Sequence, residues 1–248
     1  MTGPMEPLGF PNCRYCAYLR NGPPSTCLTC ATQTFMGIVR HACPICSQSM
    51  TGDQCPNWLC SDPNRSITRI QAIAYHNGSL RDAIIKYKYQ EKNGWSLVFG
   101  RLLLAWLNQH ARSNPPILII ANPTYMPPGD AGSGHTERVI EVAAAEDVLD
   151  EWPFDIAEQR ALIKTRDTQK SAGKPATEKR KAAQELRTSI LVKDRARIEG
   201  GRILIYDDVC TTGNQLNAIA QCLIEDGGAA EVSGIVLARA PWKTDQTP

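Results

Sequence analysis

Apolar residues between positions 67 and 240 follow two patterns that alternate along the chain. Segments such as 115–123 (PPILIIANP) and 200–208 (GGRILIYDD) are short, almost wholly apolar and bounded by proline, glycine or aspartate, which is typical of buried parallel strands. Segments such as 79–90 (SLRDAIIKYKYQ) place apolar side chains on one face of a helix. The pattern predicts strands at 67–76, 115–123, 200–208 and 231–240, and helices at 79–90, 96–111, 137–150 and 214–228.

The order of these elements predicts the fold class. Strands that alternate with helices along a chain form an α/β fold, with a mostly parallel sheet flanked by helices. In such sheets, ligands bind at the carboxyl ends of the strands. A basic, irregular stretch is expected from about 164 to 181, between the third helix and the third strand.

Eight of the ten cysteines precede residue 61 and fall into two quartets. Two residues separate the cysteines of most pairs, so that both thiolates can reach one ion from a tight turn, and two pairs complete a tetrahedral zinc shell. Two structural zinc ions are therefore predicted, with disulfides or reactive thiols as the alternatives. Sequential quartets are the simplest arrangement, and an interleaved one stays open. The predicted ligands are Cys13, Cys16, Cys27 and Cys30, then Cys43, Cys46, Cys55 and Cys60.

The cysteine-rich segment has few other means of folding. Residues 1–62 contain few aliphatic side chains and many proline, glycine, asparagine and serine residues. Such a segment is too short and polar to bury a core unaided, so metal binding would supply most of its folding free energy. We predict a double zinc-binding domain at 1–62 and a larger domain at 63–248. The arginines of the first segment are scattered, unlike those of a nucleic-acid-binding zinc module.

Composition and charge narrow the setting of the protein. The chain has 248 residues and a formal net charge of +2, so its net charge indicates no particular partner. No apolar run reaches the ~18 residues of a membrane-spanning helix, and the first residues lack the basic and apolar regions of a signal peptide. We therefore expect a cytoplasmic protein without membrane insertion, where reducing conditions disfavour structural disulfides.

Residues 202–221 (RILIYDDVCTTGNQLNAIAQ) carry the clearest candidate chemistry. Two adjacent acids, Asp207 and Asp208, end an apolar run, and a Thr-Thr-Gly turn then leads into a helix. The free N–H groups and the positive dipole at a helix start suit a phosphate, whereas the carboxylates suit neighbouring hydroxyl groups. A divalent ion such as Mg²⁺ would lessen the repulsion between carboxylates and phosphate. The pattern predicts a sugar-phosphate site, with an acid-capped strand and an ordinary turn as the alternative.

Several motifs of the chain, taken in order, resemble those of a known family. The stretch ILIYDDVCTTGNQL resembles the ribose-phosphate motif of type I phosphoribosyltransferases. The order of the cysteine module, AYHNGSLRDAIIKYKYQ (74–90), ILIIANPTY, IKTRDTQ (163–169) and the acidic pair resembles the competence-protein ComF family within that fold. The resemblance implies a phosphoribosyltransferase-like fold with a small N-terminal zinc-ribbon-like domain. It also implies binding of phosphoribosyl pyrophosphate (PRPP), or another ribose phosphate, with Mg²⁺.

The resemblance further implies residue roles. Asp207 and Asp208 would be the catalytic pair that holds the ribose hydroxyls, and residues 211–215 would bind the 5′-phosphate. The loop at 122–124 would meet pyrophosphate through the backbone N–H groups of its non-proline residues, Lys88 would add positive charge, and Arg166 would precede a mobile loop. The implied PRPP-binding residues are Asp207, Asp208, Thr211, Thr212, Gly213, Asn214, Gln215, Asn122, Pro123, Thr124, Lys88 and Arg166.

The chain also departs from the family pattern. The loop at 126–139 (MPPGDAGSGHTERV) has only His135 and Arg138 where the family carries several arginines, and Asn122 replaces a small apolar residue. These departures concern pyrophosphate handling more than ribose-phosphate binding.

Three functions follow from these patterns. The first is phosphoribosyl transfer with release of pyrophosphate. The second is PRPP binding without turnover in competence or DNA uptake, with contact to single-stranded DNA, and protein partners stay open. The third, a zinc-ribbon nucleic-acid-binding factor, would need a basic zinc module. The basic stretch from Lys164 to Arg187 fits a lid over the phosphates, a DNA contact or a solvated surface.

Overall fold

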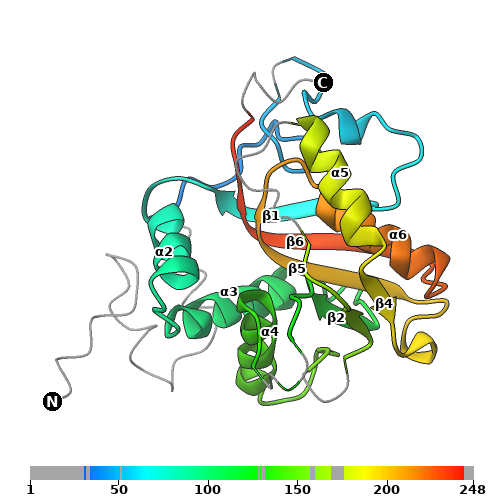
Figure 1. The fold of residues 1–248 in the computed structure, drawn as a ribbon. Helices are drawn as coiled ribbons and strands as arrows, with labels where there is room; N and C mark the ends of the chain where they lie inside the picture. The colour runs from blue at the N-terminus through cyan, green and yellow to red at the C-terminus, as the bar shows by residue number, and fades with distance from the viewer. Residues whose placement is uncertain are drawn as a thin grey trace, which may run out of the picture.

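A four-stranded sheet forms the middle of the molecule (Figure 1). The computed structural model describes residues 31, 34–50, 52–127, 129, 132–156, 160–168 and 176–242. The strand order is β1-β6-β5-β2, and all three pairings are parallel. The strands are β1 (Ile70–Tyr75), β2 (Leu118–Ala121), β5 (Arg202–Cys210) and β6 (Glu231–Arg239). The predicted α/β class with a mostly parallel sheet is confirmed.

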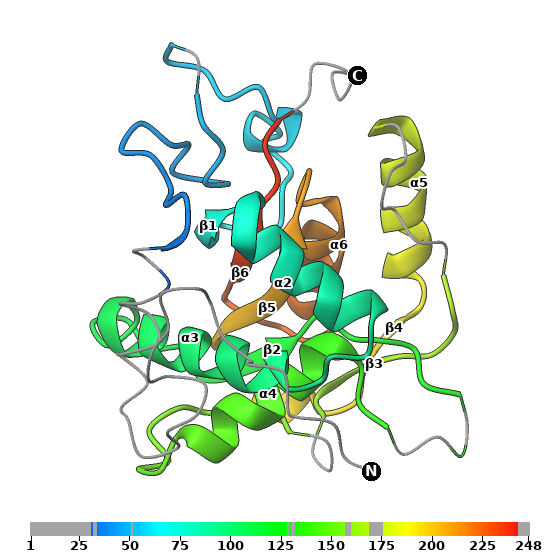
Figure 2. The same ribbon diagram turned by 90° about the vertical axis from the view of Figure 1, so that its left-hand side faces the viewer.

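Helices cover both faces of this sheet (Figure 2). Side chains alternate across a strand, so neighbouring residues Ile205 and Tyr206 of β5 belong to two different apolar clusters. The Tyr206 cluster includes helices α2 (Gly78–Tyr89), α3 (Trp95–His110) and α4 (His135–Glu146). The Ile205 cluster includes residues of α6 (Asn214–Glu225) and Leu186 of α5 (Ala176–Arg187). The sheet therefore separates two cores, and the carboxyl ends of its strands are the expected place for ligands.

The segment around α5 differs from the sequence expectation. The predicted irregular stretch at 164–181 is wrong from residue 176, where α5 begins. The buried residues Ala182, Ala183 and Leu186 lie on one helix face, and α5 packs against α6. A two-stranded antiparallel pair, β3 (Leu162–Lys164) and β4 (Ile190–Val192), flanks α5 in the chain. The dense charges of this segment concealed its narrow apolar stripe.

The end of α4, the turn that follows it and two 3₁₀ helices complete the described elements. The helix predicted at 137–150 ends at Glu146, and the next apolar residues, Val148 and Leu149, are exposed. The Asp147 carboxylate instead accepts the Trp152 N–H at 2.8 Å and closes a turn. Short 3₁₀ helices are η1 (Trp58–Cys60) and η3 (Arg195–Arg197). None of the helices in the described ranges combines the length and apolar character needed to traverse a lipid bilayer.

The described part of the cysteine-rich segment packs against β1. The Ile70 N–H donates to the Ile45 carbonyl at 2.5 Å, and Gly37 forms a bridge with Ala74. Leu59 is buried in the same cluster as Ile70 and the α6 residues. This segment therefore shares its apolar contacts with the sheet, and the boundary at residue 62 stays a prediction.

Close packing of α3 on α4 depends on Gly100. A Cβ added at Gly100 would lie 2.9 Å from Val142 Cγ1 and 3.0 Å from the Ala143 nitrogen. We expect Gly100→Ala to lower the free energy of unfolding by about 1–3 kcal/mol, measured by urea denaturation. Gly234→Ala in β6 is the control, because its added Cβ would meet its nearest neighbours at 3.4 Å. Equal losses in both variants would contradict the proposed close approach.

Candidate functional site

Four of the predicted site residues meet near the carboxyl ends of β5 and β2. Asn122, which follows β2, donates its Nδ2–H to Asp207 Oδ2 at 3.1 Å. The Asp208 N–H donates to Asp207 Oδ1 at 2.8 Å. Lys88, in the last turn of α2, places its Nζ 2.7 Å from Asp208 Oδ1 and 2.6 Å from Oδ2. The structure thus brings α2, β2 and β5 together around two buried carboxylates.

The two carboxylates have different surroundings because neighbouring residues of a strand point to opposite faces. Asp208 shares the parity of Tyr206 and meets Lys88 on the α2 side. Asp207 shares the parity of Ile205 and lines a pocket with the residues of the Thr-Thr-Gly loop. Asp207 is therefore the member of the pair that faces the loop.

Burial and charge shift the protonation of this cluster. Burial, followed by the nearby Asp208 carboxylate, raises the pKa of Asp207 to about 7, against the opposing effects of Lys88 and the two hydrogen-bond donors. Burial disfavours the ammonium of Lys88, yet the two carboxylates outweigh this effect and raise its pKa. Lys88 therefore stays charged. Near neutral pH, Asp207 is protonated only part of the time, so the charge of Lys88 offsets part of the negative charge of the two carboxylates.

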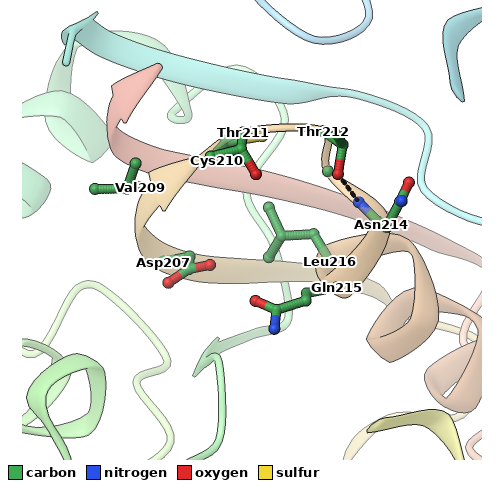
Figure 3. Close-up of a pocket in the computed structure, with 9 residues that line it drawn as sticks. Asp207, Val209, Cys210, Thr211, Thr212, Asn214, Gln215 and Leu216 are labelled. Atoms are coloured by element: carbon green, nitrogen blue, oxygen red, sulfur yellow. Dashed lines mark hydrogen bonds between the residues drawn. The ribbon is translucent and has the colours of Figure 1, made fainter. Parts of the chain in front are cut away.

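The Thr-Thr-Gly loop and the start of α6 form a small pocket beside Asp207 (Figure 3). Gly213 has a φ of 85°, in the left-handed region, and is followed by Asn214, the first residue of α6. A Cβ at Gly213 would lie 2.7 Å from Ile70 Cδ1, so both conformation and space favour glycine here. The pocket is lined by Asp207, Val209, Cys210, Thr211, Thr212, Gly213, Asn214, Gln215 and Leu216.

Two side chains at the start of α6 point in different directions. Gln215 extends toward the Asp207 side of the loop, whereas Asn214 extends the opposite way (Figure 3). Asn214 is 5% exposed, and both polar atoms of its side chain lack a partner among the described residues. A buried amide without a partner is uncommon in proteins and is usually satisfied by a ligand or water.

Arg166 does not join the acidic cluster. Its Nη2 donates to Thr188 Oγ1 at 2.8 Å, and its Nη1 lies 3.6 Å from Glu185 Oε1, so it binds residues of α5 and the turn that follows. Gln169, in the same predicted segment, lies outside the described residues.

The sequence did not reveal the role of Glu137, in the first turn of α4. Its side chain is buried, with 4% exposure, and its carboxylate accepts the Thr124 N–H at 2.5 Å and the Thr124 hydroxyl at 3.0 Å. A carboxylate is favoured at a helix start. Glu137 thus takes up the backbone donor of Thr124 that the resemblance assigned to pyrophosphate. An acid in a first helical turn is so common that this pattern carried no signal.

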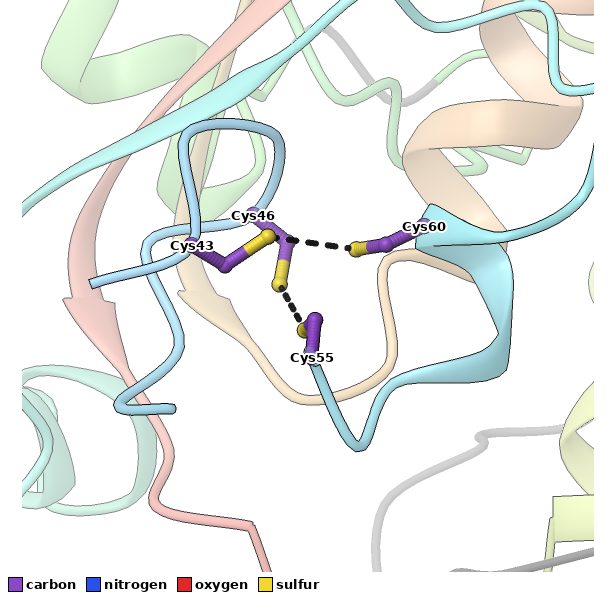
Figure 4. A group of neighbouring side chains, drawn as sticks. All are labelled: Cys43, Cys46, Cys55 and Cys60. Carbon is purple, nitrogen blue, oxygen red and sulfur yellow. Dashed lines mark hydrogen bonds between the residues drawn. The ribbon is translucent and has the colours of Figure 1, made fainter. Parts of the chain in front are cut away.

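The second cysteine quartet assembles into one cluster (Figure 4). All four sulfur atoms lie within 4.8 Å of one another. Cys43 Sγ lies 3.7 Å from Cys60 Sγ, and Cys46 Sγ lies 3.6 Å from Cys55 Sγ. A sulfur tetrahedron with Zn–S bonds of about 2.3 Å has edges of about 3.8 Å, so the cluster fits zinc. This grouping agrees with sequential pairing of the quartet.

The other predicted ligands and thiols divide differently. The first quartet, Cys13, Cys16, Cys27 and Cys30, lies outside the described residues. His41 is exposed and separate from the cluster. Burial raises the pKa of both Cys210 and Cys222 to about 11, so these thiols stay protonated and act as small apolar groups.

Comparison with known proteins adds one relative. No family model matches the chain. The chain is 24% identical over 221 residues to Competence protein ComFC of Streptococcus pneumoniae (strain ATCC BAA-255 / R6). The alignment covers 89% of this chain and 90% of that protein. This similarity supports a relation to the ComF family. The similarity extends over most of both chains.

The raised pKa of Asp207 predicts that this residue limits stability. Its pKa in the folded protein, about 7, lies above the ordinary value of an unfolded chain, so stability is lost as pH rises from about 4 to about 7. Asp207→Asn removes the buried charge and can still accept the Asp208 N–H. We expect its melting temperature to exceed that of the wild type by a few degrees at pH 8, and the difference to shrink toward pH 4.

Asp82→Asn is the matched control for this measurement. Asp82 lies on α2 with its side chain 65% exposed, so its substitution should leave the pH profile of the melting temperature unchanged. A lower melting temperature for Asp207→Asn than for the wild type at pH 8 would contradict the interpretation.

Proposed function

We propose that this chain is a competence-related protein that binds a ribose 5-phosphate group, as in PRPP, together with Mg²⁺. A type I phosphoribosyltransferase-like fold is part of this proposal. The observation that carries it is the pocket in which Asp207 stands beside the loop at 209–216. One wall offers a carboxylate and the other offers backbone N–H groups at a helix start, and a phosphorylated sugar has matching hydroxyl and phosphate groups on one molecule.

The residues of the cluster divide the recognition of such a ligand. Asp207 would accept ribose hydroxyl groups, and Thr211, Thr212 and Gly213 would donate to the phosphate. Asn122 holds Asp207 in place, and Lys88 neutralises Asp208 from the far side. Carboxylates are suitable ligands for Mg²⁺, and a bound Mg²⁺ would offset the repulsion between the acids and the phosphate.

Ligand binding without phosphoribosyl transfer is the version that the contacts favour. Transfer needs donors and cations that stabilise the departing pyrophosphate. The Thr124 N–H is bonded to Glu137, and Lys88 is paired with Asp208. Arg138 donates to Asn93 Oδ1 at 2.5 Å. Three groups that could have served the leaving group are therefore engaged elsewhere.

The basic stretch gives less support to a DNA contact. Arg187 pairs with Glu225 and with Asp226, each at 2.9 Å. Arg166 lies near Glu185. These acids offset charge that a nucleic-acid backbone would require. We therefore expect the ligand to bind in the pocket beside Asp207 and not on the basic stretch.

Calorimetry tests the pocket directly. Ribose 5-phosphate and PRPP are each titrated with Mg²⁺ into the wild type and into the double variant Asp207→Asn/Asp208→Asn. We expect binding to weaken by about tenfold or more in the double variant, because hydrogen bonds to charged acceptors contribute about 1.5–3 kcal/mol each. Asp82→Asn should bind as the wild type does. Undiminished affinity of the double variant would exclude the acidic pair from the site.

Glu137 allows a separate test of turnover. Glu137→Gln keeps the shape of the side chain and removes a buried negative charge beside Thr124. We expect its affinity for PRPP, relative to ribose 5-phosphate, to rise several-fold, because the diphosphate loses a nearby like charge. The wild type should release no pyrophosphate across a panel of nucleobases. Release by the wild type with any base would show that Glu137 does not prevent transfer.

A further inference from the structure

The cysteine cluster lies next to the Thr-Thr-Gly loop (residues 211–213), here called the phosphate loop, although the two are far apart in the sequence. Asn57 lies between Cys55 and Cys60 and is completely buried. Its Nδ2 donates to the Thr212 carbonyl at 2.9 Å, across a separation of 155 residues. Its Oδ1 accepts the Leu59 N–H at 3.3 Å, which fixes the orientation of the amide. One side chain of the cysteine segment thus holds one carbonyl of the loop.

Arg239, the last residue of β6, makes a second connection. Its guanidinium is completely buried and donates to the carbonyls of Cys210, at 2.9 Å, and of Thr211. Its Nη2 also lies 3.6 Å from Cys46 Sγ, one of the four clustered sulfurs. A buried cation requires a compensating negative charge. A zinc ion held by four thiolates carries net negative charge and would supply it on the side away from the loop.

These contacts determine where the loop N–H groups point. Asn57 and Arg239 hold the carbonyls of Cys210, Thr211 and Thr212, and the Ala240 N–H also donates to the Cys210 carbonyl at 2.9 Å. In a trans peptide, a carbonyl and the next N–H point in opposite directions, and the described residues contain no cis peptide. The N–H groups of Thr211, Thr212 and Gly213 are therefore turned away from the cluster, toward the pocket.

Packing holds the same loop from behind. Leu59 and Ile70 lie so close to Gly213 that an added Cβ would meet their side chains at 3.0 and 2.7 Å. No loop carbonyl or side chain of the described residues accepts from the three N–H groups of Thr211, Thr212 and Gly213. Successive backbone donors without acceptors can form an anion-binding concavity.

We propose that the metal-bound cysteine cluster fixes the backbone conformation of the phosphate loop, with Asn57 and Arg239 as the positioning residues that connect the two. Zinc fixes Cys46, Cys55 and Cys60 relative to one another, and thereby fixes Asn57 and the environment of Arg239. Loss of the metal releases these anchors, so the loop carbonyls can rotate and the N–H groups no longer converge. The consequence for ligand affinity rests on the proposed function, whereas the coupling of metal to loop does not.

The primary experiment needs no ligand. Amide order parameters of Thr211, Thr212 and Gly213 are measured by NMR on the full chain, with metal content determined in parallel. Asn57→Asp removes the donor and keeps the acceptor for the Leu59 N–H, and Arg239→Met removes the cation. In both variants we expect wild-type zinc content, and loop order parameters that fall from the rigid value of about 0.85 toward 0.6.

Arg65→Met is the matched control. Arg65 donates to the carbonyls of Cys60 and Asp62 on the cysteine segment, and its loss should leave the loop order parameters unchanged. Chelation of zinc from the wild type should lower them as the substitutions do. If chelation unfolds the whole chain, the zinc-loaded variants decide alone. Loop order parameters at the wild-type value in both variants would overturn the proposal.

Inorganic phosphate and ribose 5-phosphate, titrated by calorimetry, separate this proposal from the proposed function. We expect both ligands to bind the two variants about tenfold more weakly, the effect of losing one or two hydrogen bonds. If the loop responds to the substitutions but no ribose phosphate binds the wild type, the coupling stands and the proposed function fails. If ribose phosphate binds wild type and variants equally, and the loop stays rigid, the function stands and the coupling fails.

Discussion

The burial of two consecutive carboxylates is the constraint around which the carboxyl edge of the sheet is arranged. Ionised groups out of water need partners, and neighbours in a strand cannot share one because they point to opposite faces. Asp208 is therefore paired with Lys88 from α2, and Asp207 receives an amide from Asn122 and the N–H of Asp208. Of the two acids, Lys88 contacts Asp208. Burial and the neighbouring Asp208 carboxylate raise the pKa of Asp207, which is therefore suited to a further donor or a cation. A site in this condition is suited to a ligand that brings hydroxyl groups and Mg²⁺.

The same edge also contains an acid in an unexpected place. A second anion site beside the first would need free N–H groups after β2, but Glu137 already bonds to Thr124 there. The chain thus presents one open set of loop donors and one that is internally satisfied. This asymmetry separates holding a phosphorylated sugar from displacing its pyrophosphate, because only the second task needs both sets. The relation to a competence protein is compatible with either task. The contact between Glu137 and Thr124 is therefore the observation that favours binding over transfer.

Much of the architecture followed from local patterns in the sequence. Continuous apolar runs identified β2, β5 and β6. The motif at 207–213 pointed to the segment that lines the small pocket, because these signals lie within a few residues of one another. The helix α5 was missed since its buried face is only a narrow stripe among charges. The role of Lys88 could be suspected only through the resemblance, for 120 residues separate it from Asp208. Glu137, Asn57 and Arg239 act through contacts that no local pattern encodes.

The contacts of Asn57 and Arg239 explain why the cysteine segment lies against the sheet and the phosphate loop. A metal cluster that only stabilised its own segment would have no need to contact β1, β6 and the loop after β5. Instead, Cys46 lies beside Arg239 across 193 residues of chain, and Leu59 packs behind Gly213. The identity of a side chain does not determine the direction of a backbone N–H group. That direction is determined by contacts that hold the carbonyl of the same peptide. A rigid segment behind the loop would achieve this, and a bound metal ion would give the small cysteine segment a rigidity that so few apolar residues could not supply.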